Sequence, residues 1–413
     1  LCEAIHADPA TAPLLIWLNG GPGSSSLFGL MMIHGPFLLN AEGQLQYNDF
    51  SWNQYANVLY LETPSGVGFS RETTDEGDLI MNDNSTARIN AKALQDFMTR
   101  SHPRYSNRDF YITGESYAGV YIPYFAREVL EHVKSGEFTN PNLKGIAMGN
   151  AAVDYFSDEI ASSLQLYSLG MIPEKFGTEL FDKWERITEG KKPGKLSDDL
   201  REQLNTVHNT IGNRAHYDLP LLCNAPDDDT IWHIARPVPK AECNPSDVIE
   251  AYFNRPDVQY RLNVRKLQQP PIKWRMSNKY VSFIYEVDSD TIHLYKDILA
   301  LAQGDFRILF YTGDMDLVCP PLQVAFGARR IAEDNGMTTI STPAWTYLSD
   351  YGGARTSYLT SDGRVSIDVL TVRGASHMVP MTHPDRAFQL INNFISAEAK
   401  ATIEYSKTIP RKI

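Results

Sequence analysis

The stretch TGESYAG places Ser116 where the sequence can support nucleophilic chemistry. The apolar residues before it are typical of a strand, and those after it are typical of a helix. A G-x-S-x-A/G pattern in that context predicts a nucleophile elbow, a sharp turn that exposes the serine hydroxyl. Glu115 is an unexpected neighbour, because a carboxylate opposes the negative charge that develops when a serine attacks a carbonyl group.

A serine nucleophile needs a histidine base and an acid that orients it. In folds with this elbow the chain order is the serine, then the acid, then the histidine. The segment GDMD offers Asp314 and Asp316, and the segment GASHM offers His377, each after a strand-like run. We favour Asp316, which lies further along its loop, and expect one of the two aspartates to cap a turn. His383 is the competing histidine, but it stands between prolines and is typical of a helix start.

The glycine-rich segment WLNGGPGSSS follows the first strand-like run. Gly20 and Gly21 are candidates to turn backbone N–H groups toward an oxyanion, with the N–H of Tyr117 as a second donor. A phosphate-binding loop is the alternative for such a turn, but the lysine of that motif is absent.

Apolar runs with little alternation recur along the chain. They predict strands buried on both faces of a mostly parallel sheet, and this sheet would position the residues above. These runs cover residues 13–19, 57–62, 109–114, 144–150, 306–313 and 366–374. Residues 85–100 predict a helix with Ser85 as N-cap and Ile89, Ala93, Leu94 and Phe97 on one face. Residues 117–133 predict a second helix, and hairpins are expected after residue 343. The fold class is therefore α/β.

The middle of the chain differs in composition. Residues 171–251 are polar and charged, with interspersed helical stretches. We predict an inserted cap or lid subdomain there, with residues 1–170 and 252–413 forming the core; an irregular surface excursion is the alternative.

The overall composition excludes several classes of protein. A net charge of −12 over 413 residues argues against a nucleic-acid partner. No run approaches the roughly 20 apolar residues of a membrane span. The first residue is Leu1, and we expect a truncated or processed N-terminus.

Two features bear on a secretory route. Cys223 and Cys243 are close together in a loop-rich stretch and predict one disulfide, with two free thiols as the alternative. Asn84 begins an NST glycosylation sequon, a pattern that also arises by chance.

Five blocks together resemble the serine carboxypeptidase family, which includes lysosomal cathepsin A: LNGGPGSSS, SWNQYANVLYLETPSGVGFS, GESYAGVYIP, GDMDLVCP and GASHMVP. The resemblance runs from about Leu1 to the C-terminus and is weakest in the middle. It implies an α/β-hydrolase fold with helices on both faces of the sheet and an inserted helical cap. It also implies release of C-terminal residues from peptides at acidic pH through an acyl-enzyme, without metal or cofactor.

The resemblance also implies roles for individual residues. Ser116, Asp316 and His377 would form the triad, and the N–H groups of Gly21 and Tyr117 the oxyanion hole. Asn19, Gly20 and Glu115 would bind the substrate's terminal carboxylate. Two carboxyl groups in contact cannot both ionise cheaply, so a protonated Glu115 would explain both the carboxyl group beside the nucleophile and the preference for acid.

The sequence departs from the family pattern at several positions. Ile33 stands where a second glutamate is usual, so Glu115 would have to stay neutral through desolvation, or the grip on the carboxylate is weakened. Ser24 replaces a cysteine, Ser376 replaces a glycine before the histidine, and Cys319 is either a reactive thiol near the site or an inert buried one.

Two other functions remain open. An acyltransferase or esterase on the same scaffold would use the same triad, and a non-catalytic role in stabilising partner hydrolases is compatible with an intact triad. The resemblance implies the secretory pathway, either lysosome or vacuole or the extracellular space, and a homodimer is possible.

Overall fold

The computed structural model describes residues 1–71, 82–219, 245–264, 273–278, 281, 287, 290–302, 304–340, 342–396 and 403–410. Cys223 and Cys243 lie outside the described residues, so their disulfide stays a prediction. No helix in the described part of the chain has both the length and the apolar character needed to cross a bilayer.

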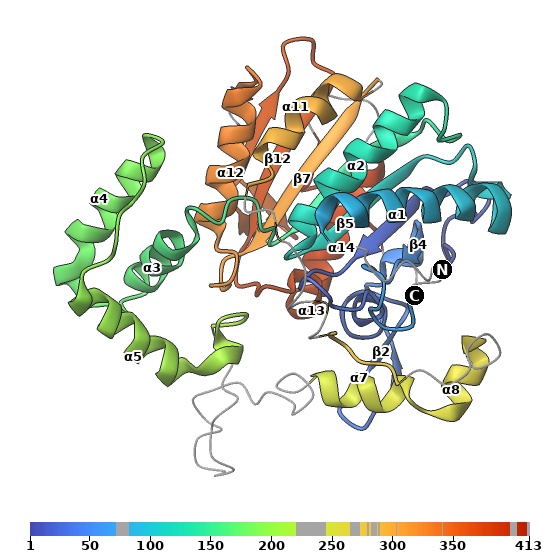
Figure 1. Ribbon diagram of the computed structural model, residues 1–413, viewed down its shortest axis with the longest axis horizontal. Helices are drawn as coiled ribbons and strands as arrows, with labels where there is room; N and C mark the ends of the chain where they lie inside the picture. Colours follow the sequence, from blue (N-terminus) through green and yellow to red (C-terminus); the bar gives the residue numbers. More distant parts are fainter. Residues whose placement is uncertain are drawn as a thin grey trace.

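An eight-stranded sheet forms the centre of the molecule, with strand order β4-β1-β5-β6-β7-β12-β11-β8 (Figure 1). Its members are β1 (Leu14–Leu18), β4 (Asn57–Tyr60), β5 (Phe110–Glu115), β6 (Leu143–Gly149), β7 (Phe306–Gly313), β8 (Thr338–Ile340), β11 (Arg355–Leu359) and β12 (Val365–Val372). Neighbours from β4 to β12 pair in parallel, whereas β11 pairs antiparallel with β12 and β8. All six predicted strands are confirmed, and their mostly apolar character with little alternation reflects burial on both faces.

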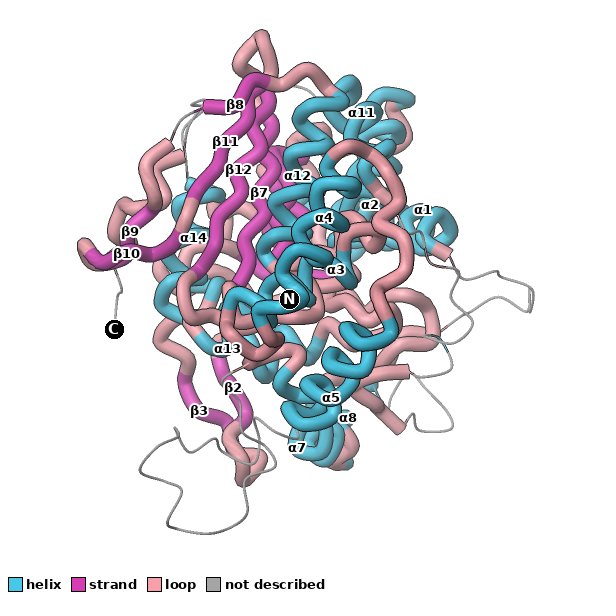
Figure 2. The backbone as a smooth tube through the Cα atoms, turned by 90° about the vertical axis from the view of Figure 1, so that its left-hand side faces the viewer, coloured by secondary structure: helices cyan, strands magenta, loops and turns pink. Residues whose placement is uncertain are grey.

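Helices cover both faces of this sheet, as Figure 2 shows. One face packs against α1 (Asp83–Asp96), α2 (Ala118–Ser135), α11 (Ile292–Leu301) and α12 (Pro321–Asp334). The other face packs against α14 (Pro384–Ser396), which follows the short α13 (Val379–Thr382). The predicted helix at residues 117–133 is α2, and it begins two residues after Ser116.

Two smaller hairpins and several short helical turns complete the core. The hairpins pair β2 (Phe37–Leu39) with β3 (Leu45–Tyr47), and β9 (Trp345–Tyr347) with β10 (Asp350–Gly353). The turns are η1 (Gly29–Ile33), η2 (Trp52–Gln54), η3 (Phe97–Ser101), η4 (Pro103–Tyr105) and η5 (Glu174–Phe176). The hairpins predicted after residue 343 are confirmed by β9–β10 and by β11–β12.

Helix α1 differs in two details from its prediction. Its N-cap is Asn82, whose side chain accepts from the N–H of Ser85, while Ser85 Oγ accepts from the N–H of Asn82. The predicted cap at Ser85 is therefore wrong, because Ser85 forms the other half of a capping box. Ile89 and Ala93 are exposed, and α1 buries the adjacent stripe instead: Ala87, Ala91 and Leu94.

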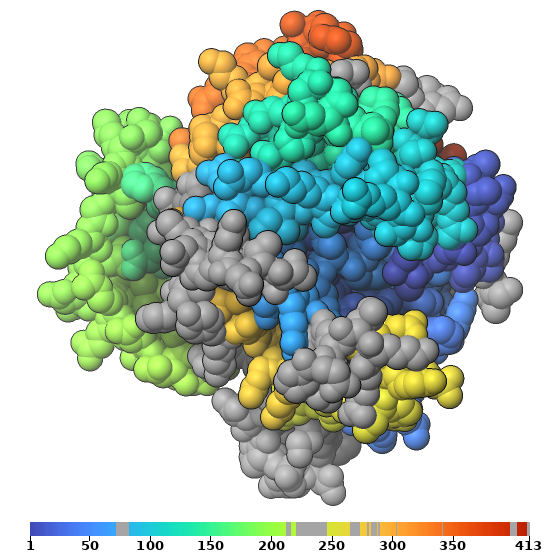
Figure 3. Space-filling view, turned by 45° about the vertical axis from the view of Figure 1, so that its right-hand side comes forward, coloured from blue at the N-terminus to red at the C-terminus, as the bar shows by residue number. Residues whose placement is uncertain are grey.

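The polar middle of the chain forms a helical lobe beside the sheet, seen in green in Figure 3. It contains α4 (Gly177–Thr188) and α5 (Asp198–Ala215), which lie in the predicted segment, and α3 (Asp158–Ser168), which precedes it. A separate apolar cluster holds these helices together and reaches the core at Leu317 and Phe326. Two further helices, α7 (Pro245–Phe253) and α8 (Pro256–Arg261), lie below the sheet in Figure 1.

Candidate active site

Ser116 lies at the sharp turn between β5 and α2. Its φ of 63° falls in the left-handed region, which a serine adopts only when its surroundings hold it there. Gly114 is required on one side of the turn, since a Cβ there would lie 2.4 Å from the carbonyl oxygen of Leu18. Gly119 is required on the other, since its Cβ would lie 2.6 Å from the carbonyl oxygen of Ala152. This strand–turn–helix geometry is that of a nucleophile elbow.

His377 and Asp316 come together at the same end of the sheet. The loop after β7 carries Asp316 and the loop after β12 carries His377, and these two strands are parallel neighbours. His377 Nδ1 donates to Asp316 Oδ2 at 2.7 Å, and both side chains are buried. This bond fixes the ring so that Nε2 is the nitrogen available to accept a proton.

Further donors surround the Asp316 carboxylate. Oδ2 accepts from Asn150 Nδ2 at 2.8 Å and from the N–H of Cys319 at 3.1 Å, and Oδ1 accepts from the N–H of Val318 at 2.8 Å. These bonds hold the carboxylate in one orientation toward His377. Asn150 was not among the predicted site residues. Its position directly after the buried strand β6, where polar side chains of parallel sheets often meet, could have identified it.

The surroundings of His377 favour its use as a base. Burial disfavours the imidazolium, but the charge and hydrogen bond of Asp316, with the charge of Glu115, outweigh it and raise the pKa of His377. Nε2 is buried and has no hydrogen-bond partner among the described residues. The N–H of His377 donates to the carbonyl oxygen of Tyr217 at 2.8 Å, so the segment after α5 also holds the histidine loop.

The competing residues have other partners. Asp314 Oδ1 accepts from the N–H of Gly374 at 2.6 Å and joins the two loops at their bases. His383 ends α13, and its carbonyl oxygen accepts from the N–H of Ala387 in α14. Neither side chain contacts His377 in any hydrogen bond of the described residues.

The glycine-rich loop approaches the elbow closely. A Cβ on Gly20 would lie 2.5 Å from the backbone nitrogen of Tyr117 and 2.8 Å from Ser116 Cβ. Gly21 has a φ of 117°, which favours glycine. The backbone of residues 20–21 therefore lies beside the Ser116 hydroxyl and the start of α2, where an oxyanion would form.

Asn19 holds the carboxyl group of Glu115. Its Oδ1 accepts from Trp17 Nε1 at 2.9 Å and from the N–H of Gly29 at 3.0 Å. Because two donors fix that oxygen, the amide nitrogen faces Glu115, and Nδ2 donates to Oε1 at 2.8 Å. Glu115 Oε2 is buried and has no partner among the described residues.

The surroundings of Glu115 favour its protonated form. Burial raises its pKa from 4.5 to about 7, with a further increase from the charge of Asp316 and opposing effects from His377 and the Asn19 hydrogen bond. Ile33, the residue in place of the second glutamate of the family, is fully buried at the end of η1. Desolvation is thus sufficient to keep Glu115 mostly neutral below pH 7.

The other departures from the family pattern have clear local settings. Ser376 Oγ hydrogen-bonds to Thr382 Oγ1 at 3.2 Å, so its hydroxyl closes the histidine loop onto α13. Ser24 forms a backbone bridge with Ser277. Cys319 is buried, and burial together with the charges of Asp316 and Asp158 raises the pKa of its thiol well above the usual range, which makes it a poor nucleophile.

The ligand atoms of Asp316, Cys319 and His377 lie within 4.8 Å of one another, a spacing compatible with a metal ion. However, His377 Nδ1 and both oxygens of Asp316 are already engaged in hydrogen bonds, and the thiol is kept protonated by its surroundings. These residues therefore fit a hydrogen-bonded orienting group better than a metal centre.

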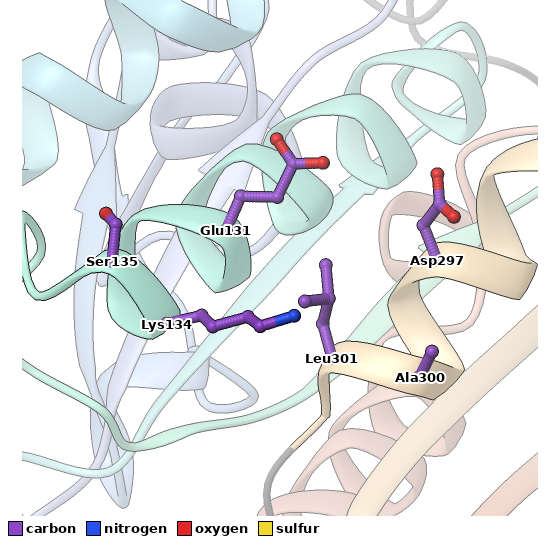
Figure 4. Close-up of a pocket in the computed structure, with 6 residues that line it drawn as sticks. All are labelled: Glu131, Lys134, Ser135, Asp297, Ala300 and Leu301. Carbon is purple, nitrogen blue, oxygen red and sulfur yellow. The ribbon is translucent and has the colours of Figure 1, made fainter.

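Two features lie away from this site. Asn84 is exposed in the first turn of α1 and accepts from Arg127 Nη2 at 3.2 Å, so its glycosylation stays a prediction at an accessible position. A pocket between α2 and α11, lined by Glu131, Lys134 and Asp297 among others, is shown in Figure 4. It lies at the end of α2 opposite Ser116.

Comparison with known proteins identifies the family. Residues 1–397 match the family model described as serine carboxypeptidase. A putative serine carboxypeptidase-like protein of Arabidopsis thaliana is 33% identical over 94% of this chain and 83% of its own length. The lysosomal protective protein of Mus musculus is 30% identical over 95% of this chain and 86% of its own length.

A solved structure confirms the fold. The crystal structure of Kex1, a prohormone-processing carboxypeptidase from Saccharomyces cerevisiae, superposes with a TM-score of 0.67 at 22% identity, covering 92% of this chain and 82% of that one. With the mostly parallel sheet, this likeness shows the predicted α/β-hydrolase fold. The chain belongs to the serine carboxypeptidase family and is a serine-type carboxypeptidase, a hydrolase.

Proposed function

We propose that the protein releases single residues from the C-termini of peptides through an acyl-enzyme on Ser116. His377 Nε2 takes the proton of Ser116 Oγ as the hydroxyl attacks the scissile carbonyl, and then gives that proton to the leaving amine. Asp316 holds the imidazole and stabilises its charged form. The N–H groups of Gly21 and Tyr117 stabilise the oxyanion, and water releases the acyl group in the reverse sequence.

The observation that carries this proposal is the buried contact between Asn19 and Glu115 directly beside Ser116. A neutral Glu115 has an O–H that can donate to a substrate carboxylate, and Gly20 adds backbone at close range. A peptide bond next to a free C-terminus would thereby be selected over an internal bond, because only the former presents a carboxylate to this group.

The same arrangement predicts a preference for acidic pH. Above the pKa of Glu115, which burial raises to about 7, the carboxylate repels that of the substrate. Protonation of Glu115 also removes one of the charges that raise the pKa of His377, so a neutral Glu115 favours the neutral base. The active form therefore has both groups uncharged, and activity should fall as the pH rises through the pKa of Glu115.

The test compares a blocked dipeptide that has a free C-terminal carboxylate with its C-terminal amide, from pH 4 to 8, with Ser116→Ala as control. We expect cleavage of the acid to fall as the pH rises through the pKa of Glu115, and we expect poor cleavage of the amide throughout. Equal cleavage of both substrates would contradict carboxylate recognition. Equal cleavage would favour the esterase or acyltransferase alternative. The apolar Ile33 at the end of η1, where the family usually has a glutamate, is compatible with that alternative.

We further propose that the segment 171–251 forms part of a cap over the carboxyl ends of the strands. The contacts that support this are between the end of α5 and the catalytic loops: the N–H of Leu317 donates to the carbonyl oxygen of His216 at 2.8 Å, and Tyr217 accepts from His377. A secretory location, in the lysosome or vacuole or outside the cell, is proposed from the relative named a lysosomal protective protein. Sedimentation would test the proposed homodimer.

A further inference from the structure

Tyr311 lies in the same lateral row of the sheet as Glu115. Glu115 in β5 pairs with Gly149 in β6, and Gly149 pairs with Tyr311 in β7. Paired residues of neighbouring strands point to the same side of a sheet, so both side chains rise from one face. Asn19, which follows β1, flanks Glu115 on the opposite side from Tyr311.

Gly149 leaves the space between them to the tyrosine ring. A Cβ on Gly149 would lie 2.6 Å from Tyr311 Cζ and 2.7 Å from its hydroxyl oxygen. The Tyr311 ring therefore leans over β6, and its hydroxyl sits above the strand next to Glu115. The backbones of Glu115 and Tyr311 are two strand spacings apart, about 10 Å. Because the ring leans over β6, the Tyr311 hydroxyl lies closer to the Glu115 side chain than the spacing of the two backbones alone would give.

Both groups have unused hydrogen-bonding capacity. Tyr311 is 3% exposed and Glu115 is 4% exposed. Neither the Tyr311 hydroxyl nor Glu115 Oε2 has a hydrogen-bond partner among the described residues. A buried polar atom without a partner is costly, and two such atoms in one row call for an explanation. The ionised Glu115 is also near enough to add to the effect of burial, and together they raise the pKa of Tyr311 well above its usual value.

We propose that Tyr311 is a positioning residue for substrate recognition: its hydroxyl donates to Glu115 Oε2 when a substrate carboxylate docks. Oε1 is already held by Asn19, so Tyr311 would fix the second oxygen. Catalytic hydrogen bonds are often long in unliganded enzymes and tighten in the complex. With Oε2–H donating to the substrate, the tyrosine can only be a donor to that oxygen. This inference rests on the proposed role of Glu115 as the carboxylate-binding group.

The direction of the effect on pH dependence follows from this geometry. The charged groups that act on Glu115 are His377 and Asp316 from the two loops, while Asn19, Gly149 and Tyr311 face it from β1, β6 and β7. A donor to Oε2 stabilises the carboxylate more than the neutral acid and so lowers the pKa. Removing the hydroxyl should therefore extend activity to higher pH, which general damage to the fold would not do.

The experiment measures kcat, which reports the enzyme–substrate complex, against pH for the blocked dipeptide acid with Tyr311→Phe, Glu115→Gln and Tyr111→Phe. We expect Tyr311→Phe to move the alkaline limb upward by about one pH unit, as the loss of one hydrogen bond to a carboxylate predicts. Tyr111→Phe is the matched control. This tyrosine lies on the same face of β5, four residues before Glu115, and its hydroxyl donates to the carbonyl oxygen of Ile395. The control should leave the limb unchanged.

The outcomes separate this inference from the function on which it rests. If Glu115→Gln abolishes the alkaline limb but Tyr311→Phe leaves it in place or lowers it, the role of Tyr311 is refuted alone. If the Glu115→Gln profile matches that of the unchanged protein, the carboxylate-binding role itself fails. If Tyr311→Phe turns over too slowly to assay, infrared difference spectra give the pKa of Glu115 directly. The band of protonated Glu115 is assigned by its loss in Glu115→Gln.

Discussion

Glu115→Gln is the most informative substitution, because it keeps the shape of the side chain and removes its titration. The glutamine carbonyl oxygen can still accept from Asn19 Nδ2, which now lies 2.8 Å from Oε1. Its amide nitrogen can donate to a substrate carboxylate at every pH. The variant should therefore retain the preference for a free C-terminus and lose the pH dependence that Glu115 imposes.

The size of the effect on activity follows from the pKa of Glu115 of about 7. In the unchanged protein the protonated fraction falls about tenfold between pH 6 and 8, and kcat/KM should fall with it. The Glu115→Gln profile should lack this fall. Its acidic limb should move to lower pH, because the Glu115 charge no longer raises the pKa of His377.

Folding stability provides a second measure of the same group. The pKa of Glu115 is raised from 4.5 to about 7 in the folded state, so between these values the unfolded chain releases a proton that the folded protein retains. Stability therefore falls as the pH rises through this window. The total cost is about 3 kcal/mol at about 1.4 kcal/mol for each pKa unit. Urea denaturation at pH 5 and 8 should show a smaller loss for Glu115→Gln.

Glu62→Gln is the matched control for the activity profile of Glu115→Gln. Glu62 is a second buried glutamate whose pKa is raised by burial, but it bonds to Ser25, Phe69 and Trp274 instead of facing Ser116. Its replacement should not change the pH at which kcat/KM falls. Parallel activity profiles for Glu115→Gln and the unchanged protein would refute the assignment of the alkaline limb to Glu115.

Four further substitutions test the site and the fold. Asp316→Asn should lower kcat about ten-thousand-fold by favouring the wrong imidazole tautomer, whereas Asp314→Asn retains an acceptor for Gly374 and should cost less than about tenfold in the same assay. Gly20→Ala should abolish labelling of Ser116 by an organophosphate, because its Cβ would lie 2.5 Å from the nitrogen of Tyr117; normal labelling would show that the loop can move aside. Asn82→Ala should cost about 1 kcal/mol in urea denaturation through loss of the α1 cap, and an unchanged midpoint would contradict that cap.

Local patterns were sufficient for much of the fold. Each of the six predicted strands is a mostly apolar run with little alternation, and a strand buried on both faces of a sheet favours that composition wherever it lies. The nucleophile elbow is equally local, because strand, turn and helix around Ser116 occupy a single stretch of chain. Helix α1 marks the limit: the period of its apolar residues was visible, but docking against α2 decided that Ala91 and Leu94, and not Ile89 and Ala93, are buried.

Sequence order was sufficient to nominate the acid and the histidine, but not to separate Asp316 from Asp314. The two aspartates are two residues apart in one loop, and only the position of His377, brought in by the neighbouring strand β12, selects between them. The role of Asn150 could not be predicted for the same reason, because its bond to Asp316 joins residues far apart in the chain.

The surroundings of Glu115 belong wholly to the tertiary structure. The sequence by itself determined that a carboxyl group precedes the serine and that Ile33 stands where the family usually has a glutamate. Only the pairing of β5, β6 and β7 decided that Tyr311 leans over Gly149 toward that carboxyl group. The physical reason is that a pKa depends on burial and on charges within a few ångströms, and those neighbours come from segments that meet only when the sheet has formed.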